Sequence, residues 1–89
     1  MDIDPHDVGK RIQAARERKG WNQSELARAV GKARQHLSLI EQGKQLPGVP
    51  LLGNIAEVLS VSTDWLLGLT GDAEDEDAPR AAWEKVAVP

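Results

Sequence analysis

The sequence predicts an all-α fold, a compact domain built from five short helices. Apolar residues recur at three- and four-residue intervals in five separate segments, and glycines or prolines stand between these segments. No stretch alternates apolar and polar residues over the length of a strand, and no long internal repeat is present. With 89 residues, the chain has room for one small domain.

The first two predicted helices have clear end signals. The first covers residues 7–19, and Gly20 follows it as a C-terminal stop. Its apolar positions share one face: Val8, Ile12 and Ala15. The second starts after Asn22, whose side chain can cap it while Glu25 closes a capping box, and Gly31 ends it. Its buried stripe is Leu26, Ala27 and Val30.

The third predicted helix begins near Ala33 or Arg34 and ends at about Gln42, with Gly43 as its terminator. Its inward-facing residues are Leu37 and Ile40. Because few residues separate it from the second helix, the two must cross steeply.

The last two predicted helices follow a loop over residues 45–50. Pro50 suits the first turn of the fourth helix because a proline there loses no helical hydrogen bond. The inward-facing residues of that helix are Leu52, Ile55, Ala56 and Leu59. A short fifth helix, capped by Ser62, carries Trp65 and Leu66 or Leu67 before Gly68.

Charge divides the chain into two parts. The net charge of −3 by itself disfavours nucleic acid as a partner. Residues 1–71, however, carry nine basic and eight acidic side chains, and every one of those basic residues precedes position 45. Residues 72–89 carry two basic and six acidic side chains, and begin with the run DAEDED. We therefore expect a helical domain over 1–71 and an acidic, solvated tail over 72–89, with a short terminal helix as one interpretation of its end.

Several function classes are disfavoured by what the chain lacks. It has no cysteine, no metal-ligand cluster, no nucleophile–base constellation and no glycine-rich phosphate loop, so we expect no enzyme, no metal and no cofactor. The acidic run lacks the ligand spacing of an EF-hand calcium loop. No apolar run is long enough to span a bilayer, and residues 1–6 do not resemble a secretory signal. A cytoplasmic location, without a membrane partner, is the expectation.

The segment NQSELARAVGKARQHLSLIEQGK, residues 22–44, resembles the helix-turn-helix of the lambda-repressor-like family, also called the XRE family, which includes the Cro and CI types of phage repressor. Residues 8–68 resemble the whole domain. The positions that fall in register are Gln23, Leu26, Ala27, Gly31, Leu37, Ile40, Glu41, Gly43 and Pro47. The resemblance implies a transcriptional regulator, most simply a bacterial or phage repressor that binds a palindromic operator in double-stranded DNA as a homodimer. It also implies a structural pair between Arg16 and Glu41.

The outward face of the third helix supplies the candidate base contacts. They are Arg34, Gln35, Ser38 and Leu39. Arginine can bond bidentately to guanine and glutamine to adenine, so Arg34 and Gln35 are the strongest base readers. Leu39 fits a thymine methyl group or an ordinary exposed leucine. The sequence departs from the family pattern at Lys32, where many members have an aliphatic residue, and at Ala33, where a Ser or Thr usually caps the third helix. The missing cap weakens a helix start by about 0.5–2 kcal/mol in typical hosts. Which residues make base contacts therefore stays open.

Candidate phosphate contacts surround the motif. They are Gln23, Lys32, His36, Gln42, Lys44 and Arg11. Gln23 stands at the start of the second helix, where the helix dipole favours an anion, and the family uses the matching glutamine for phosphate. For any single lysine and for His36, an ordinary solvated role is the alternative.

The dimer surface implied by the resemblance involves the loop before the fourth helix and the last helix. Its candidates are Leu46, Val49, Trp65, Leu67 and Leu69, although Trp65 also fits the core. The tail, with Trp83, can dock on the domain, extend the dimer or bind another protein. Two related functions therefore stay open, an antitoxin whose tail binds a toxin while its domain represses the operon, and a restriction-modification controller.

Overall fold

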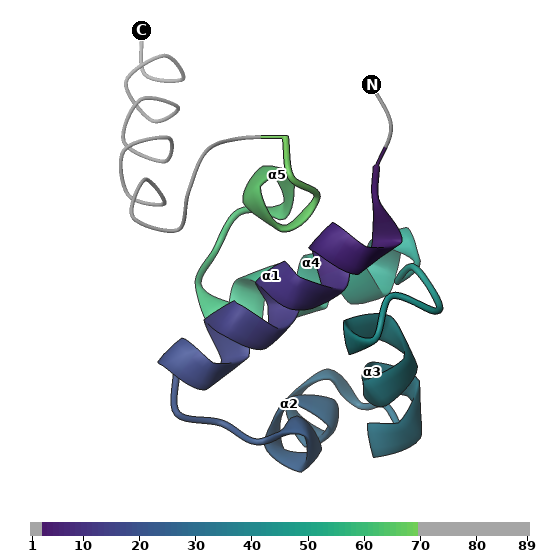
Figure 1. The fold of residues 1–89 in the computed structure, drawn as a ribbon. Coiled ribbons are helices and arrows are strands. Elements are labelled where there is room, and N and C mark those ends of the chain that lie inside the picture. Colours follow the sequence, from purple (N-terminus) through teal and green to yellow (C-terminus); the bar gives the residue numbers. More distant parts are fainter. Residues whose placement is uncertain (1–2, 70–89) are drawn as a thin grey trace, which may run out of the picture.

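The structure is a computed structural model that describes residues 3–69, and its elements confirm the predicted all-α fold (Figure 1). Within these residues there are five helices and no strand. The helices are α1 (Pro5–Arg18), α2 (Gln23–Val30), α3 (Arg34–Glu41), α4 (Val49–Leu59) and α5 (Thr63–Leu66). None of the described helices could cross a membrane, since each is too short or too polar.

Helix α1 starts earlier than predicted. The Asp4 side chain caps it by accepting a hydrogen bond from the His6 amide at 3.0 Å, and Pro5 occupies the first turn. The predicted start at residue 7 was wrong because it gave weight to the apolar period, which begins at Val8, and not to this cap. The helix ends at Arg18, with Lys19 as its C-cap.

The predicted capping of the later helices is confirmed for α2 and α5. The Asn22 side chain accepts from the Glu25 amide and the Glu25 carboxylate accepts from the Asn22 amide, both at 2.8 Å. Gly31 ends α2 in the left-handed conformation, at φ 71°. Ser62 caps α5 through the Trp65 amide at 3.0 Å. Helix α3 has no side-chain cap at Ala33.

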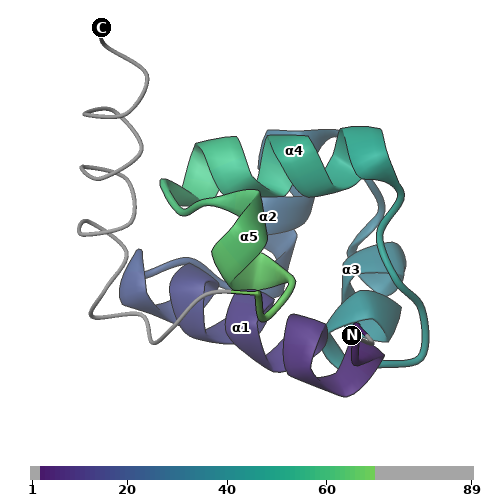
Figure 2. The same ribbon diagram turned by 90° about the horizontal axis from the view of Figure 1, so that it is seen from above.

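One hydrophobic core joins all five helices. In Figure 1, α1 passes between α5 on one side and α2 and α3 on the other. Figure 2 shows α1 and α4 along opposite sides of the domain, with α5 between them near the middle and α3 at one end. The fully buried large side chains are Val8, Ile12, Leu26, Leu37, Ile40, Ile55 and Leu66. Because the predicted stripes of α2, α3 and α4 all contribute, the core fixes where α3 presents its outer face.

Candidate nucleic-acid interface

Helices α2 and α3 form a tight helix-turn-helix. The turn is closed by Gly31 in the left-handed region and by the Lys32 amide, which donates to the Ala27 carbonyl at 2.9 Å. Ala27 is buried between the helices, where a larger side chain would push them apart. The turn therefore sets the steep crossing that the sequence predicts, and it leaves one face of α3 uncovered.

The uncovered face carries the predicted base readers. Arg34 and Gln35 are exposed at the N-terminal end of α3, whereas Leu37 and Ile40 on the opposite face are fully buried. Leu39 is 41% exposed on the same outer side. Ser38 is half-buried, and its hydroxyl accepts a hydrogen bond from the exposed Gln42 at 2.7 Å. The structure thus brings the candidate base contacts together on one accessible surface, which we call the α3 face (Arg34, Gln35, Ser38, Leu39).

The C-terminal end of α3 is held by a buried ion pair. Two nitrogens of Arg16 donate to the two carboxylate oxygens of Glu41, at 2.8 and 2.9 Å, and both residues are 8% exposed. A third nitrogen of Arg16 donates to the Trp21 carbonyl at 2.8 Å. The hydrogen bonds that Arg16 donates to the Glu41 carboxylate raise the pKa of Arg16 above its ordinary value, against the effect of burial. The fork geometry fixes α3 against α1 in direction as well as in distance.

Two glycines let the backbones of α1 and α3 meet on the same side. A Cβ on Gly9 would lie 2.5 Å from the carbonyl oxygens of Ile40 and Glu41, so only glycine fits there. A Cβ on Gly43, which ends α3 at φ 79°, would lie 2.9 Å from His6. Sequence reasoning missed the role of Gly9. The available signal was a glycine inside a predicted helix, seven positions before Arg16 and so on the same face.

Gln23 links the two ends of α3. Its side-chain nitrogen donates to Glu41 at 3.1 Å, and its side-chain oxygen accepts from the Arg34 guanidinium at 3.4 Å. A primary amide has two N–H donors, so one N–H of the half-buried Gln23 side chain is left for another acceptor. Arg34, Gln23, Glu41 and Arg16 therefore form a continuous polar chain from the α3 face to α1.

The other phosphate candidates are not all in one place. Lys32, in the turn before α3, and Lys44, just after α3, are exposed, and His36 is half-buried on α3 itself. Arg11 lies elsewhere. Its guanidinium pairs with Asp7 at 3.0 Å and donates to the Trp65 carbonyl at 3.1 Å, on the side of α1 that packs against α5. In Figure 1, α5 and α3 lie on opposite sides of α1, so the structure does not bring Arg11 to the α3 face.

The dimer candidates divide by burial. Leu46, Val49 and Leu69 are 43%, 82% and 42% exposed, and Leu67 is half-buried against the core. Trp65 is 4% exposed, so its ring belongs to the core and its assignment to a dimer surface is not supported. The reason is the short turn after α4, which folds α5 back so that Trp65 packs against α1 and α4. Trp83 and the rest of the tail lie outside the described residues.

Comparison with known proteins decides the family. Residues 12–66 match the helix-turn-helix family, which is more than half of the chain. The chain belongs to this family. Among curated members, the HTH-type transcriptional regulator SinR of Bacillus subtilis is 36% identical over 80 residues, which cover 89% of this chain and 72% of SinR. No known enzyme class is associated with this match.

Solved structures of the helix-turn-helix family have the same fold. SinR, described as the master regulator for biofilm formation, in complex with DNA is 41% identical, with a TM-score of 0.64 over 67% of this chain and 97% of that one. The SinR/SinI complex has 39% identity and a TM-score of 0.65 over 85% and 78%. The restriction-modification controller C.AhdI from Aeromonas hydrophila has 25% identity and a TM-score of 0.67 over 73% and 98%.

Proposed function

We propose that this chain is a transcriptional repressor that binds a palindromic DNA operator as a homodimer and reads the major groove with the α3 face. The observation that carries the proposal is the pairing of Arg34 with Gln23, at 3.4 Å, at the exposed start of α3. This pairing holds a guanidinium at the end of the helix that enters the groove in helix-turn-helix proteins. Membership of the family and the DNA complex of SinR support DNA as the ligand.

The polar chain of Arg34, Gln23, Glu41 and Arg16 orients part of the α3 face in the free protein. A long hydrogen bond to Gln23 directs the exposed Arg34 guanidinium, which reduces part of the side-chain entropy that is lost when it reaches a base. The same amide keeps one N–H for a phosphate at the N-terminus of α2, where the dipole favours an anion. Lys32 and Lys44 add phosphate attraction that does not depend on sequence. Arg34 and Gln35 then discriminate between bases, each by about 1–3 kcal/mol.

The homodimer part of the proposal rests on three exposed apolar side chains. Leu46 and Val49 flank the start of α4, and Leu69 follows α5. Isolated exposed leucines are common, but a valine that is 82% exposed at a helix start gains stability when a second surface covers it. Two copies related by a twofold axis would place two α3 helices on half-sites about 34–36 Å apart.

The experiment is selection of bound sites from a random DNA duplex pool, followed by affinity measurements on variants. We expect a palindromic consensus with half-sites about one helical turn apart. Arg34→Ala and Gln35→Ala should each erase the preference at particular operator positions. Lys44→Ala, the matched control, should weaken all duplexes to a similar degree. Uniform losses from all three variants would contradict the base-reading assignment, and a pool without any selected site would contradict the function itself.

A protein partner is a second part of the proposal, separate from DNA binding. The SinR/SinI complex shows that a relative of similar sequence assembles with another protein. For this chain the candidate contact is the tail over residues 72–89, in line with the antitoxin hypothesis. Co-purification of an unrelated small protein with the full chain, lost when residues 72–89 are deleted, would support it. Retention of that protein by the deleted chain would place the contact on the helical domain.

A further inference from the structure

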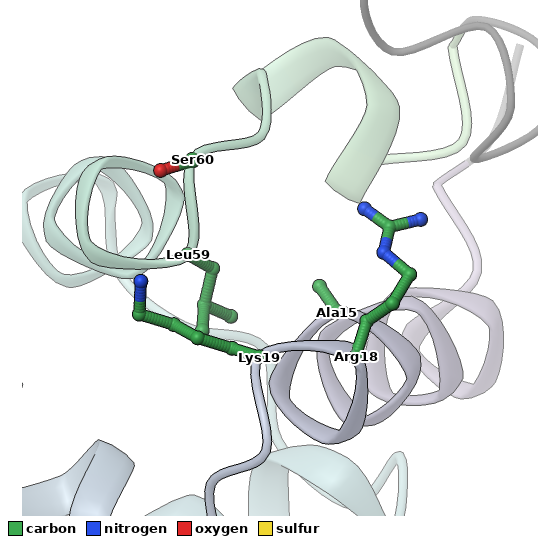
Figure 3. A pocket seen from close by; sticks show the side chains of 5 residues that line it. All are labelled: Ala15, Arg18, Lys19, Leu59 and Ser60. Atoms are coloured by element: carbon green, nitrogen blue, oxygen red, sulfur yellow. The ribbon is translucent and has the colours of Figure 1, made fainter.

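The C-terminal ends of α1 and α4 flank an open, shallow hollow of about 180 Å³ (Figure 3). Its apolar lining comes from Ala15 and Leu59, and Arg18, Lys19 and Ser60 complete its rim. In Figure 3 the side chains of Arg18 and Lys19 extend to opposite sides, with Ala15 and Leu59 between them. The hollow therefore offers two separated cations above an apolar floor, which suits a short segment carrying several carboxylates.

A buried tryptophan beside this hollow has an unmet hydrogen-bonding group. The Trp65 ring centroid lies 6.0 Å from the Arg18 guanidinium and 5.2 Å from that of Arg11. Its indole N–H is buried and has no hydrogen-bond partner in the described part of the chain. A buried indole N–H normally finds an acceptor. The indole N–H itself is closed to a partner, but the guanidinium groups of Arg11 and Arg18 beside the ring give this side of α1 and α5 positive charge, which suits a partner that brings carboxylates.

The chain leaves the described domain on this same side. Leu69 is the last described residue, and a Cβ on Gly68 would lie 2.5 Å from the Asp7 carboxylate and 3.7 Å from the Arg11 guanidinium that pairs with it. Residues 72–77 follow after two positions and contain five carboxylates. An extended chain covers about 3.5 Å per residue, so this run reaches about 14–30 Å from Gly68. Arg18 lies only about 10 Å along α1 from Arg11, well within that reach.

The electrostatic balance of the hollow makes the two cations decisive. The C-terminal ends of α1 and α4 each carry partial negative charge, which opposes an acidic occupant. Lys19 also lies over the Trp21 ring, 5.1 Å from its centroid, but a cation–π contact does not neutralise the charge of an ammonium. The side chains of Arg18 and Lys19 bring positive charge to the rim of the apolar floor, and this charge opposes the partial negative charge of the helix ends. Binding of carboxylates here should therefore fail without Arg18 or Lys19, and it should weaken with salt.

We propose that the hollow is the docking site of the chain's own acidic segment, residues 72–77, with its carboxylates paired to Arg18 and Lys19. Figures 1 and 2 show the C-terminal end of α1 at the opposite end of the domain from α3. Docked there, the acidic segment stays away from the α3 face and does not repel DNA phosphates. The hollow shares no residue with the α3 face, so it is a binding site separate from the one for DNA.

The test uses a water-soluble carbodiimide on the full chain without DNA. This reagent joins a lysine amine to a carboxylate with loss of water, and only when the two groups touch. We expect mass spectrometry to find Lys19 linked to residues 72–77 several-fold more often than Lys10, the matched lysine on the outer side of the same helix. Arg18→Gln should reduce the Lys19 link several-fold, as should salt at about 1 M, where the screening length falls to about 3 Å. Arg28→Gln, on α2, should not.

Two outcomes would overturn the proposal by placing the acidic segment elsewhere. Links mainly to Lys32 or Lys44 would place it beside α3, and equal yields at all lysines would mean that it stays in solvent. A mixture of isotopically heavy and light chains separates a third outcome, because links that join heavy to light would show that the segment docks on a second copy. Loss of DNA binding in the same preparations would bear on the proposed function alone, since the links form without DNA.

Discussion

The two ends of α3 are held in opposite ways. At the C-terminal end, Arg16 donates two buried hydrogen bonds to Glu41. Gly9 also allows the backbone of α1 to touch that of α3 there. At the N-terminal end, Ala33 provides no side-chain cap, and Arg34 is exposed with one long hydrogen bond to Gln23. The two ends of α3 therefore meet different structural requirements. The C-terminal end, which sets the direction of α3, is fixed against the core, and the N-terminal end keeps its polar groups accessible.

The largest expected effect comes from breaking the fixed end at its ion pair. Glu41→Ala should destabilise the domain by about 3–5 kcal/mol, because it leaves the Arg16 charge buried without a partner. A small domain has only about 5–15 kcal/mol of unfolding free energy, so urea denaturation will show this loss clearly.

A double variant tests whether that loss comes from the orphaned charge. Arg16→Met combined with Glu41→Leu should be much less destabilised than Glu41→Ala alone, because no charge is then buried. Its DNA affinity should nevertheless fall, since the fork that orients α3 is gone. A double variant as unstable as the single one would mean that packing at these two positions, and not charge, holds the end of α3.

A smaller effect is expected where the backbones of α1 and α3 touch. Gly9→Ala should cost about 1–3 kcal/mol, because the new methyl group meets the carbonyls of Ile40 and Glu41 and must push α3 away. Gly53→Ala in α4 is the matched control, since nothing lies within 4 Å of a Cβ there. That control should stabilise the protein by about 0.5–1 kcal/mol through helix propensity. If both glycines gave the same sign in thermal denaturation, the close contact at Gly9 would be refuted.

The smallest expected change in stability comes from adding a side-chain cap at the N-terminal end of α3. Ala33→Ser supplies a cap whose hydroxyl can accept from the amide of Gln35 or His36, and it should add about 0.5–2 kcal/mol. Hydrogen exchange at these two amides should slow, while exchange at Glu41 stays as it is. Operator affinity should change little, because the α3 face is unaltered. A large gain in affinity would mean that the start of α3 is frayed in the free protein and becomes ordered on DNA.

Local signals in the sequence were enough for most of the fold. The capping box of Asn22 and Glu25, the Gly31 stop and the Ser62 cap each involve residues a few positions apart, so their geometry follows from the helix itself. The predicted start of α1 is misplaced because Asp4 and Pro5 precede Val8, where the helical period of apolar residues begins. The α3 face was also predictable, since burial of Leu37 and Ile40 fixes which side points outward.

Local patterns in the sequence are therefore enough to predict the five helices, the exposure of the candidate base contacts Arg34 and Gln35, and the separation of a basic half from an acidic tail. Four assignments depend on the tertiary structure. The backbone of α1 touches that of α3 at Gly9, and Gln23 joins Arg34 to Glu41. Arg11 donates a hydrogen bond to the Trp65 carbonyl in α5, and the Trp65 ring lies in the core. The physical reason is range. Caps and periodicity act within one or two helical turns, whereas these four assignments depend on which helices meet and at what angle, and packing of the whole core sets that angle.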